Sequence, residues 1–199
     1  LNNILKVSGI LNGTTNYILT KMESENLSFD KALEDAQSKG YAELDPTSDI
    51  EGLDAAYKLT ILSSICFGSE INFKNNEITG IKKIKIDDII NAKKLGYRIK
   101  LISEASIINN EISCVTEPKL IKMNNPLASV SGVLNAVQIQ TDQLENLFLE
   151  GEGAGGKATA SSIISDLYEI FFNSKISSLG YKISNLKHLK KHDILEIER

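Results

Sequence analysis

Apolar residues in the first 68 positions recur mostly at three- and four-residue spacing, the period of an amphipathic helix. Before this pattern begins, residues 1–7 predict a short apolar strand. The first helix is expected to follow, with Asn12 or Thr14 as its N-cap, because their side-chain oxygens can accept hydrogen bonds from first-turn amides. A second helix is expected to begin after an N-cap at Ser28 and to end at Gly40.

A third helix is expected from about Glu51, after an acidic loop at residues 41–50. Its apolar positions follow one another at four-residue spacing and are Leu53, Tyr57, Ile61 and Ile65. Across residues 52–69 the charged side chains are those of Asp54 and Lys58, which lie one helical turn apart. We therefore expect both faces of this helix to be covered, with Lys58 at the edge of a buried segment.

From Tyr97 onward the apolar period changes to two, which is typical of strands. The predicted strands are residues 97–107, 112–116, 133–140 and 144–150. Pro118 and Pro126 are expected to bracket an irregular link between them. A glycine-rich stretch at 151–156 leads into a final helix at about 159–172. Helices followed by antiparallel strands and one last helix predict an α+β fold.

Composition and charge exclude several classes of protein. The chain has 199 residues, 42% of them hydrophobic, which is enough for one domain or slightly more with a real core. A net charge of −4 argues against a general nucleic-acid-binding protein, and no apolar run approaches the roughly 18–20 residues that span a membrane. Cys66 and Cys114 stand in apolar surroundings, which favours reduced core thiols and a cytoplasmic protein.

The two ends suggest a piece of a longer protein. Leu1 is not a methionine, and residues 193–199 resemble a strand cut short. Residues 173–199 as a whole are rich in serine and lysine and are expected to form a linker or stub.

Asp54 and Lys58 have two interpretations. A surface ion pair at i, i+4 contributes only about 0.3–0.5 kcal/mol and needs no function. The uncharged sequence around them favours burial, and a covered lysine must be paired or lose its proton. A paired or deprotonated lysine can exchange a proton at a controlled distance, as general acid–base chemistry requires.

The acidic loop is also open to more than one interpretation. Its carboxylates are Glu43, Asp45 and Asp49, with Asp54 following on the helix. An EF-hand is excluded, because Ile50 stands where its glycine would be if Asp45 were the first ligand. His188 and His192 stand in a tail with several lysines that we expect to be solvated, so we expect no metal site there. Either the loop is simply solvated or its carboxylates bind a cation such as an ammonium group.

The glycine-rich stretch at 151–156 precedes a helix N-terminus, where backbone amides can hold an anion. A flexible joint between sheet and helix explains the same glycines. The order also differs from the strand followed by GxGxxG of a complete dinucleotide-binding unit.

Three stretches resemble motifs of the homoserine dehydrogenase catalytic domain. They are residues 9–19 (GILNGTTNYIL), residues 40–58 (GYAELDPTSDIEGLDAAYK) and residues 153–167. On this basis, residues 1–172 are identified as a catalytic and dimerisation domain, and residues 173–199 as a C-terminal linker. The resemblance implies an α+β fold with a mixed, largely antiparallel sheet covered by helices. It also implies that the last helix, about 157–172, returns to a nucleotide-binding domain that this chain lacks.

The resemblance implies an oxidoreductase that interconverts L-aspartate 4-semialdehyde and L-homoserine with NAD or NADP, in threonine, methionine and isoleucine biosynthesis. The implied catalytic residues are Lys58, a proton donor, and Asp54 beside it. The implied substrate-binding residues are Glu43, Asp49, Tyr41, Gly13 and Thr14. Gly153 and Gly155 are implied to approach the cofactor. A homodimer formed through the sheet is also implied. We expect this chain alone to be inactive; the alternative is a non-catalytic dimerisation or ligand-binding module.

Overall fold

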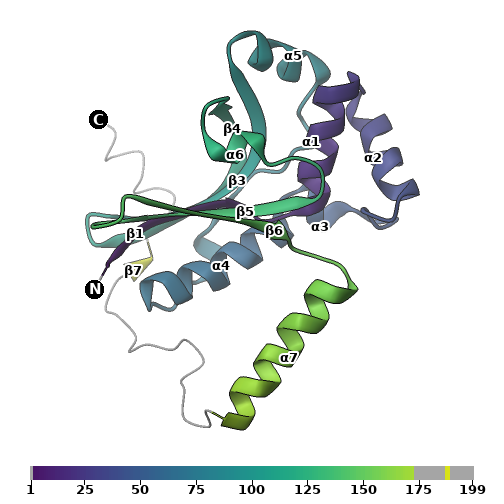
Figure 1. The fold of residues 1–199 in the computed structure, drawn as a ribbon. Coiled ribbons are helices and arrows are strands. Elements are labelled where there is room, and N and C mark those ends of the chain that lie inside the picture. The colour runs from purple at the N-terminus through teal and green to yellow at the C-terminus, as the bar shows by residue number, and fades with distance from the viewer. Residues whose placement is uncertain (1, 173–186, 189–199) are drawn as a thin grey trace.

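One mixed sheet organises the chain in the computed structural model, which describes residues 2–172 and 187–188 (Figure 1). The strands follow the order β2-β4-β3-β1-β5-β6, with β7 also pairing with β4. Their bounds are β1 Ile4–Ile10, β2 Glu77–Ile78, β3 Tyr97–Ile108, β4 Glu111–Lys122, β5 Leu134–Thr141, β6 Asn146–Glu152 and β7 Lys187–His188. Neighbours from β4 through β6 are antiparallel, whereas β2 and β7 pair with β4 in parallel. The predicted α+β class with a mixed, largely antiparallel sheet is therefore confirmed.

Helices connect and cover these strands. Their bounds are α1 Gly13–Glu25, α2 Phe29–Ser38, α3 Thr47–Ile50, α4 Leu53–Phe67, α5 Ile86–Lys94, α6 Pro126–Ser129 and α7 Gly156–Phe172, with a 3-10 helix, η1, at Phe73–Asn75. The predicted caps are confirmed: the Asn12 side chain accepts from Thr15 N at the start of α1, and the Ser28 side chain accepts from Lys31 N at the start of α2. Gly40, just beyond α2, has the left-handed φ of 75° that favours glycine.

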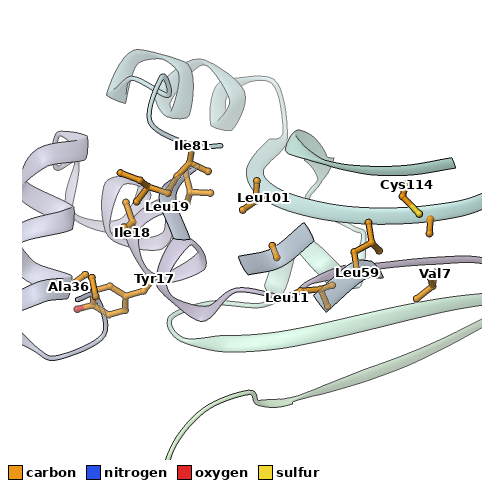
Figure 2. Close-up of a cluster of buried hydrophobic side chains, with 14 of the residues drawn as sticks. Val7, Leu11, Tyr17, Ile18, Leu19, Ala36, Leu59, Ile81, Leu101 and Cys114 are labelled. Atoms are coloured by element: carbon orange, nitrogen blue, oxygen red, sulfur yellow. The ribbon is translucent and has the colours of Figure 1, made fainter. Parts of the chain in front are cut away.

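Two hydrophobic clusters lie on the two faces of the sheet. The larger one joins α1, α2 and α4 to one face and includes Val7, Ile18, Leu59 and Leu101 (Figure 2). The smaller one lies beneath α6 and is made by Ile10, Ile102, Leu127, Val130 and Ala136. The rest of this second face carries polar side chains, among them an ion pair of 2.8 Å between Lys6 and Glu104. The helices thus cover one face of the sheet more completely than the other.

The strand boundaries differ from the predicted ones where glycine and proline were taken as breaks. β1 continues through Gly9 to Ile10, because Gly9 pairs with Ser103 on one side and Val137 on the other. Pro118 lies within β4, opposite Leu101 of β3. On the other edge of β4, β2 pairs only with Val115 and Thr116, so the missing amide of proline costs no ladder bond there.

The prediction that both faces of α4 are covered is wrong. Its inner side is made mostly of small residues, including Ala55, Ala56 and Ser63, which let the helix pack against the sheet. Its outer side exposes large apolar residues: Tyr57, Ile61 and Ile65 are 52%, 63% and 44% exposed. The Lys58 side chain is 51% exposed, so this lysine lies at a surface rather than at the edge of a dry core.

The helix α7 leads away from the sheet and buries none of its residues against the described part of the chain (Figure 1). None of the helices described combines the length and the apolar character needed to cross a membrane. Of the predicted linker, residues 173–186 and 189–199 lie outside the described residues.

Candidate active site

A cavity of about 540 Å³ opens where the N-terminus of α1 meets the N-terminus of α4 and the Gly-rich end of β6. Its lining residues are Asn12, Gly13, Thr14, Gly40, Tyr41, Asp49, Asp54, Lys58, Val133, Asn135, Glu152, Gly153, Ala154 and Gly155. The cavity therefore gathers residues from all three motif stretches. Eight of the nine residues that the sequence singled out for a site are among them; Glu43 is not.

Asp54 and Lys58 form the charged pair of this cavity. Lys58 Nζ donates a hydrogen bond of 2.8 Å to Asp54 Oδ2, one turn earlier on α4. Both side chains keep contact with solvent, so the bond adds little to stability. A lysine ammonium has three donors, so after the bond to Asp54 it can still donate to a ligand oxygen.

Asn12 connects this pair to a second carboxylate. Its Nδ2 donates to Asp54 Oδ2 at 2.8 Å and to Asp49 Oδ1 at 2.7 Å. The short helix α3, which the sequence did not predict, carries Asp49 into the cavity. Asp45 supports the start of α3, because its carboxylate accepts from the amide and hydroxyl of Thr47, and these bonds lower the pKa of Asp45.

Tyr41 and the loop that carries it form one wall of the cavity. Thr14 Oγ1 donates to the carbonyl of Tyr41 at 2.7 Å, which ties this loop to the first turn of α1. The Tyr41 ring lies 4.8 Å from that of Tyr17, whose hydroxyl donates to Asp35. Lys39 bonds to the Asp35 carboxylate and thereby holds its pKa below the ordinary value. Tyr41 thus packs against Tyr17, whose hydroxyl is fixed by its hydrogen bond to Asp35.

Gly13 allows the backbone of α1 to approach the wall formed by β5. A Cβ atom at this position would lie 2.7 Å from the carbonyl oxygen of Val133, closer than real side chains come. Glycine is therefore required here by the tight contact between two lining segments.

Glu43 stands apart from the other candidate residues. It is exposed and does not line the cavity, although the side-chain amide of Gln37 donates to its carbonyl at 3.0 Å. The structure therefore places the Glu43 backbone beside the site and leaves its carboxylate outside the lining.

The Gly-rich segment forms another part of the cavity lining. A Cβ at Gly153 would lie 2.5 Å from Asn135 Oδ1, so this glycine is required by its neighbour. Gly155 has a φ of 116° and open space around it. Backbone amides of a turn before a helix N-terminus, like this one before α7, can hold an anionic group. The strand and GxGxxG of a full nucleotide site are not among the described residues.

Sequence reasoning missed several lining residues. Glu152 lies inside the glycine-rich stretch, and its carboxylate within that candidate anion-binding segment could have identified it as a site residue. Asn135 and Val133 gave no signal, because a strand's register decides which of its side chains reach a cavity. In the part of the chain that the structure describes, no three His, Cys, Asp or Glu side chains are grouped as metal ligands.

The fold and cavity define an α+β domain whose polar site can bind a cationic group through carboxylates and exchange a proton through a lysine. Comparison with known proteins narrows this class. The sequence model described as homoserine dehydrogenase matches residues 1–168. The chain is 42% identical over 195 residues to the homoserine dehydrogenase of Helicobacter pylori, covering 98% of this chain and 46% of that protein.

Solved structures agree with this match. A homoserine dehydrogenase from Thiobacillus denitrificans superposes with a TM-score of 0.90 at 37% identity, covering 95% of this chain and 46% of that one. A hyperthermophilic archaeal homoserine dehydrogenase in complex with NADPH has a TM-score of 0.71 at 33% identity, covering 84% and 47%. The chain therefore belongs to the homoserine dehydrogenase family of oxidoreductases. It spans about half the length of these relatives.

Proposed function

We propose that the complete protein interconverts L-homoserine and L-aspartate 4-semialdehyde with NAD or NADP, in the cytoplasm, as a step toward threonine, methionine and isoleucine. In this proposal, residues 1–172 bind the substrate and form the dimer. The observation that carries it is the Asp54–Lys58 pair at 2.8 Å in a cavity that also presents Asp49. Family membership supports the choice of substrate.

The cavity offers complementary groups to each end of homoserine. The Asp49 carboxylate can accept from the substrate ammonium, as charge-assisted hydrogen bonds do. Glu43 lies beside the site on the loop held by Gln37, and a modest movement of that loop would bring it to the same ammonium. At the other end, Lys58 Nζ can face the substrate hydroxyl or carbonyl oxygen.

Lys58 then handles the proton of the reaction. Oxidation of homoserine breaks the hydroxyl O–H bond and a C–H bond of the carbon that bears the hydroxyl. The proton would pass to Lys58, which must present a free lone pair to accept it, and the hydride would leave the carbon. When bound, the nicotinamide cofactor supplies the hydride chemistry. In the reverse direction Lys58 donates the proton to the carbonyl oxygen as the alcohol forms. Asp54, bonded to Nζ, keeps the lysine in place in both directions.

The described residues fit only part of a cofactor site. Gly153 and Gly155, which line the cavity together with Lys58, would approach the cofactor. The exposed apolar side chains of α7, among them Ile164, Leu167 and Phe171, support a helix that packs against a nucleotide-binding domain. We therefore propose that this chain alone binds dinucleotide weakly and does not turn over.

The proposal is tested by homoserine oxidation in the complete protein, followed as reduction of NAD or NADP. We expect activity in the complete protein, none in residues 1–199 alone, and at least about a hundredfold lower kcat in Lys58→Ala, since general acid–base groups contribute roughly 10²–10⁴-fold. KM for homoserine should change much less. Because Lys58 is half exposed, this variant should keep its fold.

Lys82→Ala is the matched control, since Lys82 is an exposed lysine in a loose 3.7 Å pair with Glu51 outside the cavity. Near-normal kcat in Lys58→Ala would refute the role of this lysine. A complete protein that leaves homoserine unchanged would refute the proposed function itself.

A further inference from the structure

We propose that Asn12 is a positioning residue that sets the geometry of both cavity carboxylates and, through Asp54, of Lys58. The inference rests on the proposed function for its kinetic consequences but not for its structural ones. Asn12 is 4% exposed, so its bonds are shielded from competing water. From the sequence alone, Asn12 looks like an ordinary helix N-cap.

The two ends of the Asn12 amide have different tasks. Its Oδ1 accepts from Thr15 N at 2.8 Å and from Thr15 Oγ1 at 3.0 Å, which fixes the side chain to the first turn of α1. Its Nδ2 has two hydrogens, and these are directed to Asp49 Oδ1 and Asp54 Oδ2. One buried amide therefore joins α1 to both α3 and α4.

The contact with Asp54 reaches the reacting group. Asp54 Oδ2 accepts from Asn12 Nδ2 and from Lys58 Nζ, each at 2.8 Å. The carboxylate oxygen that accepts from the Lys58 ammonium is thus also held by Asn12. The Asn12 amide also offsets repulsion between the Asp49 and Asp54 carboxylates, because each carboxylate accepts a hydrogen bond from the same amide nitrogen. Glu152 is the remaining charged residue that lines the cavity.

A capping role alone predicts a different response to substitution. Aspartate caps helices about as well as asparagine, so Asn12→Asp keeps the acceptor for Thr15. The substitution replaces the amide donor by an oxygen of a third carboxylate, which would face those of Asp49 and Asp54. Asn12→Ser also keeps a capping acceptor and removes the side-chain amide donor without adding charge. The two variants therefore separate the helix-capping role of Asn12 from its role in holding the Asp49 and Asp54 carboxylates.

Both variants are compared with wild type in the complete protein, using homoserine oxidation. We expect kcat/KM to fall roughly tenfold to a hundredfold in Asn12→Ser, the size of lost hydrogen bonds to charged groups, and further in Asn12→Asp. The loss should appear in kcat more than in KM, because Lys58, which handles the proton, is displaced together with Asp54. Asn72→Asp, which changes the cap of η1 outside the cavity, should behave as wild type.

A second readout does not depend on activity. The Tm of Asn12→Asp should lie below wild type at pH 7, and the gap should narrow toward about pH 4, where carboxylates lose their charge and the repulsion disappears. Wild-type kcat and KM in Asn12→Asp, or a Tm gap that does not change with pH, would overturn the proposal. If wild type shows no homoserine oxidation, the proposed function fails while the Tm comparison still tests Asn12.

Discussion

Lys100 illustrates how a single charge can be taken into the core of this fold. The residue lies on β3 beneath the α6 segment and is 2% exposed. Its Nζ donates to Asn16 Oδ1 at 2.9 Å and to the Val130 carbonyl at 2.6 Å, both uncharged oxygens. Burial lowers its pKa to about 8; Glu23 opposes this shift and Arg98 adds to it. Lys100 thereby ties α1 to the loop that leads into the Val133–Asn135 wall of the cavity.

The shifted pKa predicts a pH dependence of stability. In the unfolded chain Lys100 binds its proton up to about pH 10.5, whereas in the fold it loses the proton near pH 8. Between these values the unfolded state holds more protons, so the free energy of unfolding rises with pH, by on the order of 3 kcal/mol. Below about pH 8 both states are charged, and this contribution is absent.

Urea denaturation of wild type and Lys100→Met from pH 7 to pH 10.5 measures this effect. The wild-type free energy of unfolding should rise relative to the variant across pH 8–10.5, while Lys122→Met, at an exposed position of β4, should follow wild type. Parallel curves for wild type and Lys100→Met would show that Lys100 does not titrate in this range.

The residue scale also shows which site features were predictable. The i, i+4 spacing of Asp54 and Lys58 predicts their contact, because it follows from one helix alone. The bonds of Asn12 to Asp49 and Asp54 span 37 and 42 residues, and they depend on how three helix ends meet. Lys100 alternates along β3 with the apolar residues Ile99 and Leu101, and this alternation does not indicate its burial, which depends on α6, an element with too few residues to predict.

Among the secondary-structure elements, the junction between α3 and α4 depends on a close contact with the segment before α5. Ile81 N donates to the Ile50 carbonyl at 2.8 Å, and a Cβ at Gly80 would overlap Ile50 O and lie 2.7 Å from the Glu51 carbonyl carbon. Because those atoms are backbone, they cannot rotate away. The segment thus supports the helix that carries Asp49.

Gly80→Ala should therefore lower the free energy of unfolding by about 1–3 kcal/mol, the usual cost of overpacking. Urea denaturation checks this value. Gly156→Ala is the matched control, since a Cβ there meets open space, and alanine favours the helix that begins at this residue. Equal stability of Gly80→Ala and wild type would mean that the α3–α4 junction can shift without cost.

The same scale explains why α4 was predicted with the wrong exposure. Its spacing correctly indicates a helix with a face of large apolar residues, and such a face normally points inward. Here Ala55, Ala56 and Leu59 pack against the sheet, while Tyr57 stacks on Phe73 at a ring distance of 4.2 Å on the outside. Periodicity identifies an apolar face but does not identify the surface that covers it.

For the whole molecule, the order of helices and strands predicted the fold class but not the strand order. β1 lies between β3 and β5, although both of these strands are far from β1 in the sequence. As a central strand it has both edges paired, as buried backbone groups require. The resulting sheet has one face under α1 and α4. Its other face carries α6 at one end and, beside it, a cavity of about 280 Å³ lined by Lys6, Glu104, Lys119 and Gln138 among others.

We propose that two copies of the chain associate through this second face. The face is a surface of five antiparallel strands, β4, β3, β1, β5 and β6, and its ion pairs between Glu104 and both Lys6 and Lys119 are only partly exposed. In a two-fold dimer each residue near the axis meets its own copy. Gln138 lies on β5 opposite Ser8 of the central strand β1, and a charge there would be repeated across the interface.

Sedimentation equilibrium tests the association. Wild type should show twice the 21.9 kDa mass of the chain. Gln138→Arg should shift the mass toward the monomer, because two like charges meet at the interface and lose their hydration. Gln143→Arg adds the same charge at the exposed turn between β5 and β6 and should leave the dimer intact. A wild-type mass of one chain would refute the proposal. A dimer that persists in Gln138→Arg would show that another surface joins the copies, and the exposed apolar side of α4 would then be the next surface to test.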